Sequence, residues 1–185
     1  MTAARRQAAR TVKPVVDTVV VAVSTGITAA TAMKLTQYIR PECFLPSVQD
    51  HTREDALRTL VHVVADKGFI RDERDVFTRL MDRENIQSTA VGNGIAIPHC
   101  FIDEVPDLII AVARAPGGLD FDSFDGKPTH VVFLLMGNRQ EHSLHLKALA
   151  RIARLIKSTA FIDRIRVSAT VEDMVKAFEQ EEAKI

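Results

Sequence analysis

One histidine ends an uncharged, glycine-containing stretch near the middle of the chain. Residues 88–98 (STAVGNGIAIP) precede His99, and no charged residue lies between Glu84 and Asp103. An imidazole can be both neutral and nucleophilic near neutral pH. The two glycines let the backbone approach a ligand closely. His99 is therefore a candidate nucleophile, and the structural alternative is a histidine that ends a strand and binds a nearby carbonyl.

Two further histidines and one arginine could act with His99. His142 and His145 are three residues apart at the start of a predicted helix, so they share roughly one helix face. A helix N-terminus carries unpaired N–H groups and favours anions. Arg83 follows another predicted helix, and its guanidinium suits a phosphate or carboxylate. Together these residues could bracket a phosphoryl group. The structural alternatives are solvated helix-start histidines and a surface arginine.

A zinc site is a second interpretation of the same region. His99, Cys100, His142 and His145 are residue types that bind zinc, but their spacings match no common zinc pattern. His99 and Cys100 are neighbours, and neighbouring side chains in an extended segment point to opposite sides. A nucleophilic cysteine paired with a histidine base is therefore disfavoured.

The composition excludes some classes of partner. Lys plus Arg and Asp plus Glu number 24 each, so the formal net charge is zero and gives no general attraction to nucleic acid or to an anionic membrane. One tyrosine and no tryptophan argue against a base-stacking surface. Two cysteines, Cys43 and Cys100, are too few for a disulfide framework and fit a reducing compartment. We expect a cytoplasmic protein with no nucleic-acid partner and no stable membrane insertion.

Residues 1–32 differ from the rest of the chain. A basic start is followed by the apolar run Val19–Val23 and then by small residues, an order that imitates a secretory signal. Asp17 interrupts the apolar region, and the run is far shorter than the ~20 residues that span a bilayer. A tail, a weak export signal and residues upstream of a misplaced start codon remain open. We expect residues 1–32 to be an N-terminal extension, disordered or a misplaced start, and residues 33–185 to form the domain.

The remaining chain alternates helical and strand patterns. Thr52 and Thr170 each begin a capping-box pattern that predicts the start of a helix, the first ending at Gly68. Further segments are predicted as helices at 73–82 and 141–157, strands at 108–113 and 130–136, and a turn at 116–118. Helices and strands that alternate without a strict period predict an α/β fold, with a mixed parallel and antiparallel sheet flanked by helices in a single domain.

The stretch that ends in His99 also resembles a known motif. Ser88-Thr89 followed by residues 92–99 (GNGIAIPH) is similar to the phosphorylation-site motif of enzyme IIA domains of the fructose/mannitol type. These domains belong to the bacterial phosphoenolpyruvate:sugar phosphotransferase system, and the family includes a nitrogen-related regulatory branch. Further similar segments are Arg83-Glu84, Val105-Pro106-Asp107, Leu119-Asp120-Phe121, Asp125-Gly126-Lys127-Pro128 and His145-Leu146-Lys147-Ala148-Leu149. The resemblance covers about residues 33–182.

The resemblance implies a role for three residues. His99 matches the histidine that takes a phosphoryl group from the phosphocarrier HPr or a paralogue of it. His145 matches a second active-site histidine that binds the phosphate or orients His99, and Arg83 matches an arginine of the same pocket. His142 has no match, and Cys100 stands where the family commonly has a small residue such as glycine. The implied mechanism needs no cofactor.

Three functions follow as expectations. The first is a phosphohistidine carrier, charged by an HPr-like protein, that acts on regulatory target proteins as a standalone nitrogen-type regulator. It is favoured because the chain has no recognisable fused IIB, IIC or HPr segment. The second is a fructose/mannitol-type enzyme IIA that donates to an enzyme IIB cysteine for sugar uptake. The third, of another class, is a binding module with a His/Cys metal site.

Overall fold

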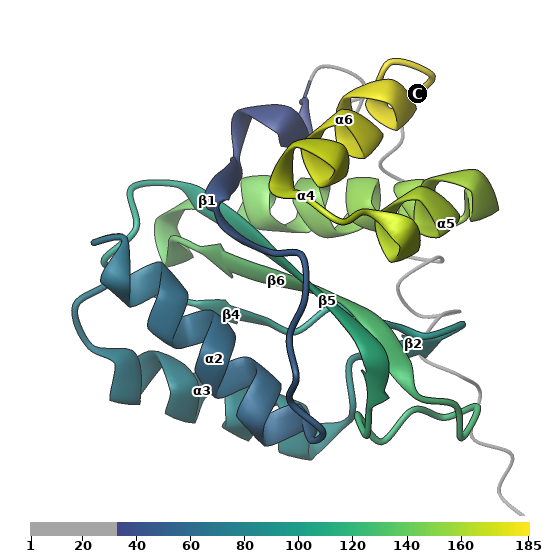
Figure 1. The fold of residues 1–185 in the computed structure, drawn as a ribbon. Coiled ribbons are helices and arrows are strands. Elements are labelled where there is room, and N and C mark those ends of the chain that lie inside the picture. Colours follow the sequence, from purple (N-terminus) through teal and green to yellow (C-terminus); the bar gives the residue numbers. More distant parts are fainter. Residues whose placement is uncertain (1–32) are drawn as a thin grey trace, which may run out of the picture.

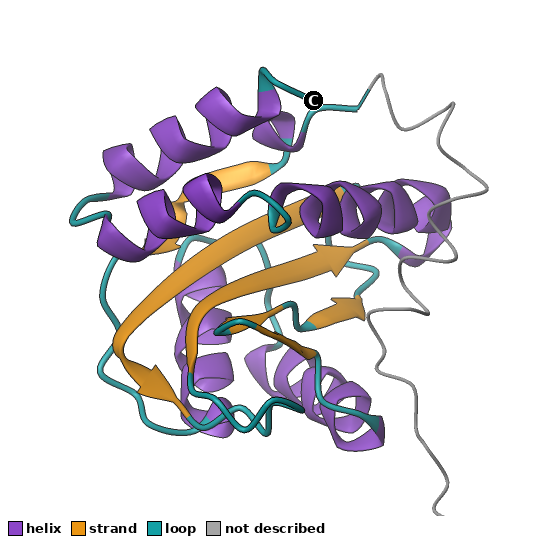
Figure 2. Ribbon diagram, turned by 90° about the vertical axis from the view of Figure 1, so that its right-hand side faces the viewer, coloured by secondary structure: helices purple, strands orange, loops and turns teal. Residues whose placement is uncertain are grey.

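A mixed six-stranded sheet lies between two layers of helices in the computed structural model, which describes residues 33–185 (Figure 1). One face carries α2 (Arg53–Asp66) and α3 (Glu73–Ile86). The other face carries α4 (His142–Leu155), α5 (Thr159–Val167) and α6 (Val171–Glu182). Figure 2 shows the twisted strands between these two layers. The predicted α/β fold with a mixed sheet is confirmed.

The two longest strands form the centre of the sheet. The strands are β1 (Ile39–Leu45), β2 (Ala90–Gly92), β3 (Ile95–Ala96), β4 (His99–Phe101), β5 (Leu108–Leu119) and β6 (Thr129–Gly137). Their order is β1-β5-β6-β3-β2, and β4 also pairs with β6. β5 and β6 are antiparallel, whereas β1 pairs parallel with β5, and β3 and β4 pair parallel with β6. Two short 3-10 helices, Leu35–Gln37 and Arg139–Glu141, complete the elements.

Each face of the sheet has its own hydrophobic core. Along β5, Ile109 and Ala111 belong to the core under α2 and α3, whereas Leu108 and Ile110 belong to the core under α4, α5 and α6. Because both faces are covered, the central strands are almost continuously apolar. The apolar segments therefore predicted the start of β5 and nearly the whole of β6, which is only one residue longer at each end than expected.

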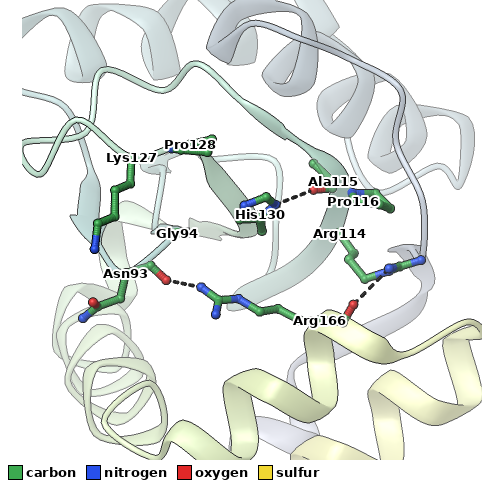
Figure 3. Close-up of a pocket in the computed structure, with 9 residues that line it drawn as sticks. All are labelled: Asn93, Gly94, Arg114, Ala115, Pro116, Lys127, Pro128, His130 and Arg166. Atoms are coloured by element: carbon green, nitrogen blue, oxygen red, sulfur yellow. Dashed lines mark hydrogen bonds between the residues drawn. The ribbon is translucent and has the colours of Figure 1, made fainter.

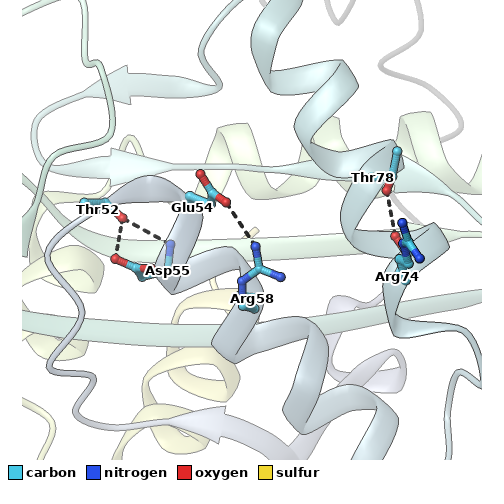
Figure 4. A network of polar contacts seen from close by, with 6 residues as sticks. All are labelled: Thr52, Glu54, Asp55, Arg58, Arg74 and Thr78. Carbon is cyan, nitrogen blue, oxygen red and sulfur yellow. Dashed lines mark hydrogen bonds and ion pairs between the residues drawn. The ribbon is translucent and has the colours of Figure 1, made fainter.

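Polar side chains set the first residues of two helices. The Thr52 hydroxyl oxygen accepts a hydrogen bond from the Asp55 backbone N–H at 3.2 Å (Figure 4), which satisfies one of the free donors of the first turn of α2. Thr170 and Asp173 form a complete capping box at α6. Both helices begin where the sequence predicts.

Three elements differ from the prediction. α3 continues to Ile86 instead of ending at residue 82. The predicted turn at residues 116–118 is wrong, because β5 runs through it to Leu119 with an irregular register after Arg114. An irregularity of this kind lets a strand contain proline and glycine without ending. α5, a helix of only nine residues capped by Ser158, was not predicted.

The predictions for residues 1–32 concern a segment outside the described part of the chain. Within residues 33–185, no helix has the length and apolar character needed to cross a bilayer.

Candidate functional site

The uncharged stretch before His99 is part of the sheet. β2 and β3 form an antiparallel hairpin, and its two-residue turn is Asn93-Gly94, with φ of 53° and 72°. Positive φ at both central residues is the geometry of the tight hairpin turns that Asn-Gly favours. After a break at Pro98, His99 opens β4 opposite Leu135 of β6. Pairing of β3 and of β4 with β6 therefore fixes the backbone on both sides of Pro98 and positions His99.

The hydrogen bond of His99 decides which ring nitrogen is free. Nδ1 lies 2.9 Å from the carbonyl oxygen of Ile97. A carbonyl can only accept, so Nδ1 carries the proton and Nε2 keeps its lone pair. Burial lowers the pKa of His99, and the positive charge of Arg83 lowers it further, against the opposing effect of the bond to Ile97. His99 is therefore a neutral imidazole near neutral pH.

His145 lies beside His99. It sits in the first turn of α4, is 1% exposed, and its ring centroid is 5.9 Å from that of His99. Phe101 packs on it, with centroids 4.3 Å apart. Burial, then the charges of His99 and His142, lower the pKa of His145 to about 4. Neither ring nitrogen has a hydrogen-bond partner among residues 33–185.

Close packing holds the His145 ring against the end of β6. A Cβ atom on Gly137 would overlap the His145 ring at Nδ1 and crowd its Cγ. The absence of a side chain at residue 137 therefore leaves room for the His145 ring, and a larger residue there would displace the ring.

Arg83 shares a cleft with His99. The cleft has a volume of about 530 Å³, and we call it the His99 cleft. Arg83 lies in the last turn of α3, and its Nη1 donates to the Gln87 carbonyl at 3.0 Å. The wall that comes from α4, α5 and the segment between them has apolar residues, including Leu149 and Ile162, and charged residues, including Arg166. The structure thus places Arg83 and His145 each beside His99, and His145 lies outside the lining of the His99 cleft.

A buried carboxylate that the sequence analysis missed supports this arrangement. Glu84 is 1% exposed and accepts hydrogen bonds from the Thr89 backbone N–H at 2.6 Å and from its hydroxyl at 2.8 Å. Burial raises the pKa of Glu84, and the two bonds from Thr89 oppose that rise. The contact joins the end of α3, which carries Arg83, to the strand that leads to His99. A glutamate on a helix usually faces solvent, so the residue type alone did not indicate that Glu84 is buried and binds Thr89.

The four residues of the zinc alternative do not come together as one set of ligands, although His99 and His145 are neighbours. Cys100 packs in the core under α2 and α3, on the opposite face from His145, and burial raises its pKa to about 12. His142 is exposed and stacks on Phe101, with centroids 5.1 Å apart. Within residues 33–185 no group of three or more His, Cys, Asp or Glu side chains could hold a metal ion. The expectation that His99 and Cys100 point to opposite sides is confirmed.

Comparison with known proteins shows what the chain is similar to. The chain is 38% identical over 136 residues to a nitrogen regulatory protein of Bradyrhizobium diazoefficiens. This alignment covers 74% of this chain and 88% of the relative. It is also 31% identical over 124 residues to the fructose-specific EIIABC component of the phosphotransferase system of Bacillus subtilis. That alignment covers 67% of this chain and 20% of the relative.

Solved structures show the same fold. The crystal structure of nitrogen regulatory protein IIA-Ntr from Neisseria meningitidis matches 78% of this chain and 98% of its own, with a TM-score of 0.72 and 21% identity. The mannitol enzyme IIA of Escherichia coli, solved in complex with phosphorylated enzyme IIB, matches 77% of this chain and 99% of its own, with a TM-score of 0.65 and 18% identity. The model of the family described as the phosphoenolpyruvate-dependent sugar phosphotransferase system, EIIA 2, matches residues 37–181, and the chain belongs to that family.

Proposed function

We propose that this protein is a phosphohistidine carrier in which Nε2 of His99 accepts a phosphoryl group from an HPr-like phosphocarrier and passes it on. The observation that carries the proposal is the neutral His99 ring, whose Nδ1 is bound to Ile97 and whose Nε2 is free to act as nucleophile. Arg83 in the same cleft and the neighbouring His145 are donors suited to the charge of a phosphoryl group.

The transfer exchanges one phosphorus–nitrogen bond for another. The Nε2 lone pair of His99 attacks the phosphorus of the donor phosphohistidine, in line with the donor nitrogen, which leaves with its electron pair. The Nδ1 proton stays on His99, where the Ile97 carbonyl stabilises the positive charge that develops on the ring. Charge in such a transfer lies on the peripheral phosphoryl oxygens, so fixed donors matter more than acid–base groups.

His145 would supply one of these donors. Its pKa of about 4 keeps the ring neutral, so it offers one N–H without holding a second proton. A buried N–H without a partner costs roughly 1–3 kcal/mol. A phosphoryl oxygen on His99 would accept a hydrogen bond from this N–H and remove that destabilisation. His145 would therefore favour the phosphorylated state over the free one.

The comparisons favour the regulatory branch of the family. The match to the nitrogen regulatory protein extends over 88% of that relative, whereas the match to the fructose-specific component covers 20% of a longer protein. We therefore propose a nitrogen-type regulator whose phosphorylation state governs target proteins. The alternative is donation to an enzyme IIB cysteine, supported by the solved complex of a mannitol enzyme IIA of this fold with phosphorylated enzyme IIB.

Labelling with phosphoenolpyruvate, enzyme I and HPr tests the proposal. We expect one acid-labile phosphate per chain, and none in His99→Ala. The matched control is His62→Ala, which removes an exposed histidine of α2 and should label normally. Label that persists in His99→Ala, or no label with a competent donor pair, would rule out the proposed acceptor. Adding enzyme IIB separates the branches, because only the transport branch predicts rapid loss of the label to its cysteine.

A further inference from the structure

A second cavity adjoins the His99 cleft and has a different character. Its volume is about 590 Å³, and it shares Asn93 and Arg166 with the cleft. Three cationic side chains line it, from Arg114, Lys127 and Arg166, together with His130 (Figure 3). None of its described lining residues is acidic. Because the formal net charge of the chain is zero, this concentration of positive charge is a local feature. We call this cavity the basic pocket.

Main-chain carbonyls hold the two arginines of the basic pocket. Arg114 donates from Nε to the Pro46 carbonyl at 2.5 Å and from Nη1 to the Arg166 carbonyl at 2.9 Å. Arg166 in turn donates from Nη2 to the Asn93 carbonyl. Among residues 33–185, the carboxylate within 4.0 Å of Arg166 is that of Asp163, at 4.0 Å from Nη1, which is a weak contact on the helix surface. Neutral acceptors thus orient both guanidinium groups without cancelling their charge.

Two unpaired donors and one acceptor belong to the residues that line the pocket. Nε of Arg166 has no hydrogen-bond partner among residues 33–185, and because this atom is buried a ligand reaches it only when the side chain shifts. Lys127 is exposed, and its ammonium group makes no hydrogen bond or ion pair within the same residues. Nδ1 of His130 donates to the Ala115 carbonyl at 3.1 Å, so its Nε2 can accept. Figure 3 shows the Lys127 and Arg166 side chains converging on the Asn93-Gly94 turn.

We propose that the basic pocket binds a small phosphorylated metabolite, with its phosphate dianion between Arg166 and Lys127. Arginine forks and lysine ammonium groups are the side chains that bind phosphate esters most strongly. A volume of about 590 Å³ exceeds the need of a bare phosphate and is in the range of small-molecule sites. Pro116 and Pro128 give the pocket apolar walls for the organic part, and Nε2 of His130 can accept from a hydroxyl group.

The position of the site links it to the turn that precedes His99. A Cβ atom on Gly94 would overlap the Arg166 guanidinium and crowd the His130 ring, so the turn and the pocket wall are in direct contact. A phosphate that engages Arg166 therefore changes the surroundings of the Asn93 and Gly94 amides. Binding itself does not depend on phosphotransfer at His99.

Amide resonances of the ¹⁵N-labelled protein, titrated with glycerol 3-phosphate at constant ionic strength, test the site. We expect saturable shifts at Asn93, Gly94 and His130. Arg166→Gln should weaken binding roughly tenfold or more, and Lys127→Gln several-fold, from the loss of a charged hydrogen bond. Lys157→Gln is the matched control, because it removes one exposed charge that lines only the His99 cleft and should leave binding unchanged.

Three outcomes would overturn the proposal. Shifts confined to His99 and Thr89 would place the phosphate in the His99 cleft, and equal weakening by all three variants would show general charge attraction. Equal affinity for malonate would contradict the preference for phosphate. Inorganic phosphate should bind more weakly than glycerol 3-phosphate if the proline walls contact the organic part. Lys127→Gln keeps the test decisive even if Arg166→Gln disturbs the turn, since Lys127 is exposed.

Discussion

Removing the Glu84 side chain should loosen the helix end that carries Arg83. In Glu84→Ala the Thr89 backbone N–H loses its acceptor at a residue only 6% exposed. An unsatisfied buried donor costs roughly 1–3 kcal/mol and a lost methylene about 0.8 kcal/mol, partly offset by removal of a buried carboxylate. We expect a net loss of about 2 kcal/mol in the free energy of unfolding, which lowers Tm by roughly 4–8 °C for a chain of this size.

Glu84→Gln separates the hydrogen bonds from the charge. The amide can still accept from the Thr89 N–H and can donate to the Thr89 hydroxyl, while the cost of burying a charge disappears. The pKa of Glu84 is raised in the folded state, so its stabilising contribution is greatest below the unfolded pKa and declines as pH rises through the folded pKa. At neutral pH, Glu84→Gln should therefore match or exceed the unaltered protein in stability.

Urea unfolding at pH 5 and pH 7.5 measures both effects. The matched control is Glu54→Ala, which breaks the exposed Glu54–Arg58 pair of α2 (Figure 4) and should change stability by less than about 0.5 kcal/mol. Equal losses in Glu84→Ala and Glu54→Ala would refute the structural role of the buried carboxylate. So would a Glu84→Gln variant as unstable as Glu84→Ala at pH 7.5.

Three further predictions concern the residues around the acceptor. Gly137→Ala should lower the unfolding free energy by about 1–3 kcal/mol by pushing on the His145 ring, whereas Gly117→Ala, with open space around it, should be nearly neutral in urea unfolding. The pKa of His145 falls from 6.5 to about 4 on folding, so stability present above pH 6.5 should decrease by about 3 kcal/mol as pH falls to 4. His145→Gln should abolish that decrease and the exposed-site control His62→Gln should not; identical pH profiles would contradict the assigned pKa. Arg83→Gln should slow single-turnover phosphoryl transfer at least tenfold with little change in Tm, and an unchanged rate would remove Arg83 from the mechanism.

The fold elements that could be predicted are those determined by local signals. The cap residues Thr52 and Thr170 located two helix starts, and the apolar run of β6 predicted a strand covered on both faces. The turn at residues 116–118 was predicted from proline and glycine alone. It is absent because pairing with β6 resumes at Leu119 and carries the strand through. That pairing depends on tertiary structure, so a local sequence pattern cannot predict it.

The site could be predicted in its members but not in its arrangement. His99 and His145 come together because β4 pairs parallel with the end of β6, and α4 begins just after β6. The spacing of the histidines does not contain this topology. The residue types suggested that these side chains could act together, and the resemblance to the enzyme IIA motif assigned each of them a role. Glu84 was missed for a related reason. Its partner Thr89 is close in sequence, but its burial depends on how α3 packs against the sheet.

The central claim concerns one atom, Nε2 of His99. Long-range ¹H–¹⁵N correlation spectra of the imidazole rings, recorded on ¹⁵N-labelled protein phosphorylated through enzyme I and HPr, report which ring nitrogen carries the phosphoryl group. The hydrogen bond from Nδ1 to the Ile97 carbonyl predicts phosphorus on Nε2 of His99, with the proton still on Nδ1. Phosphorus on Nδ1 of His99, or on His145, would contradict the account.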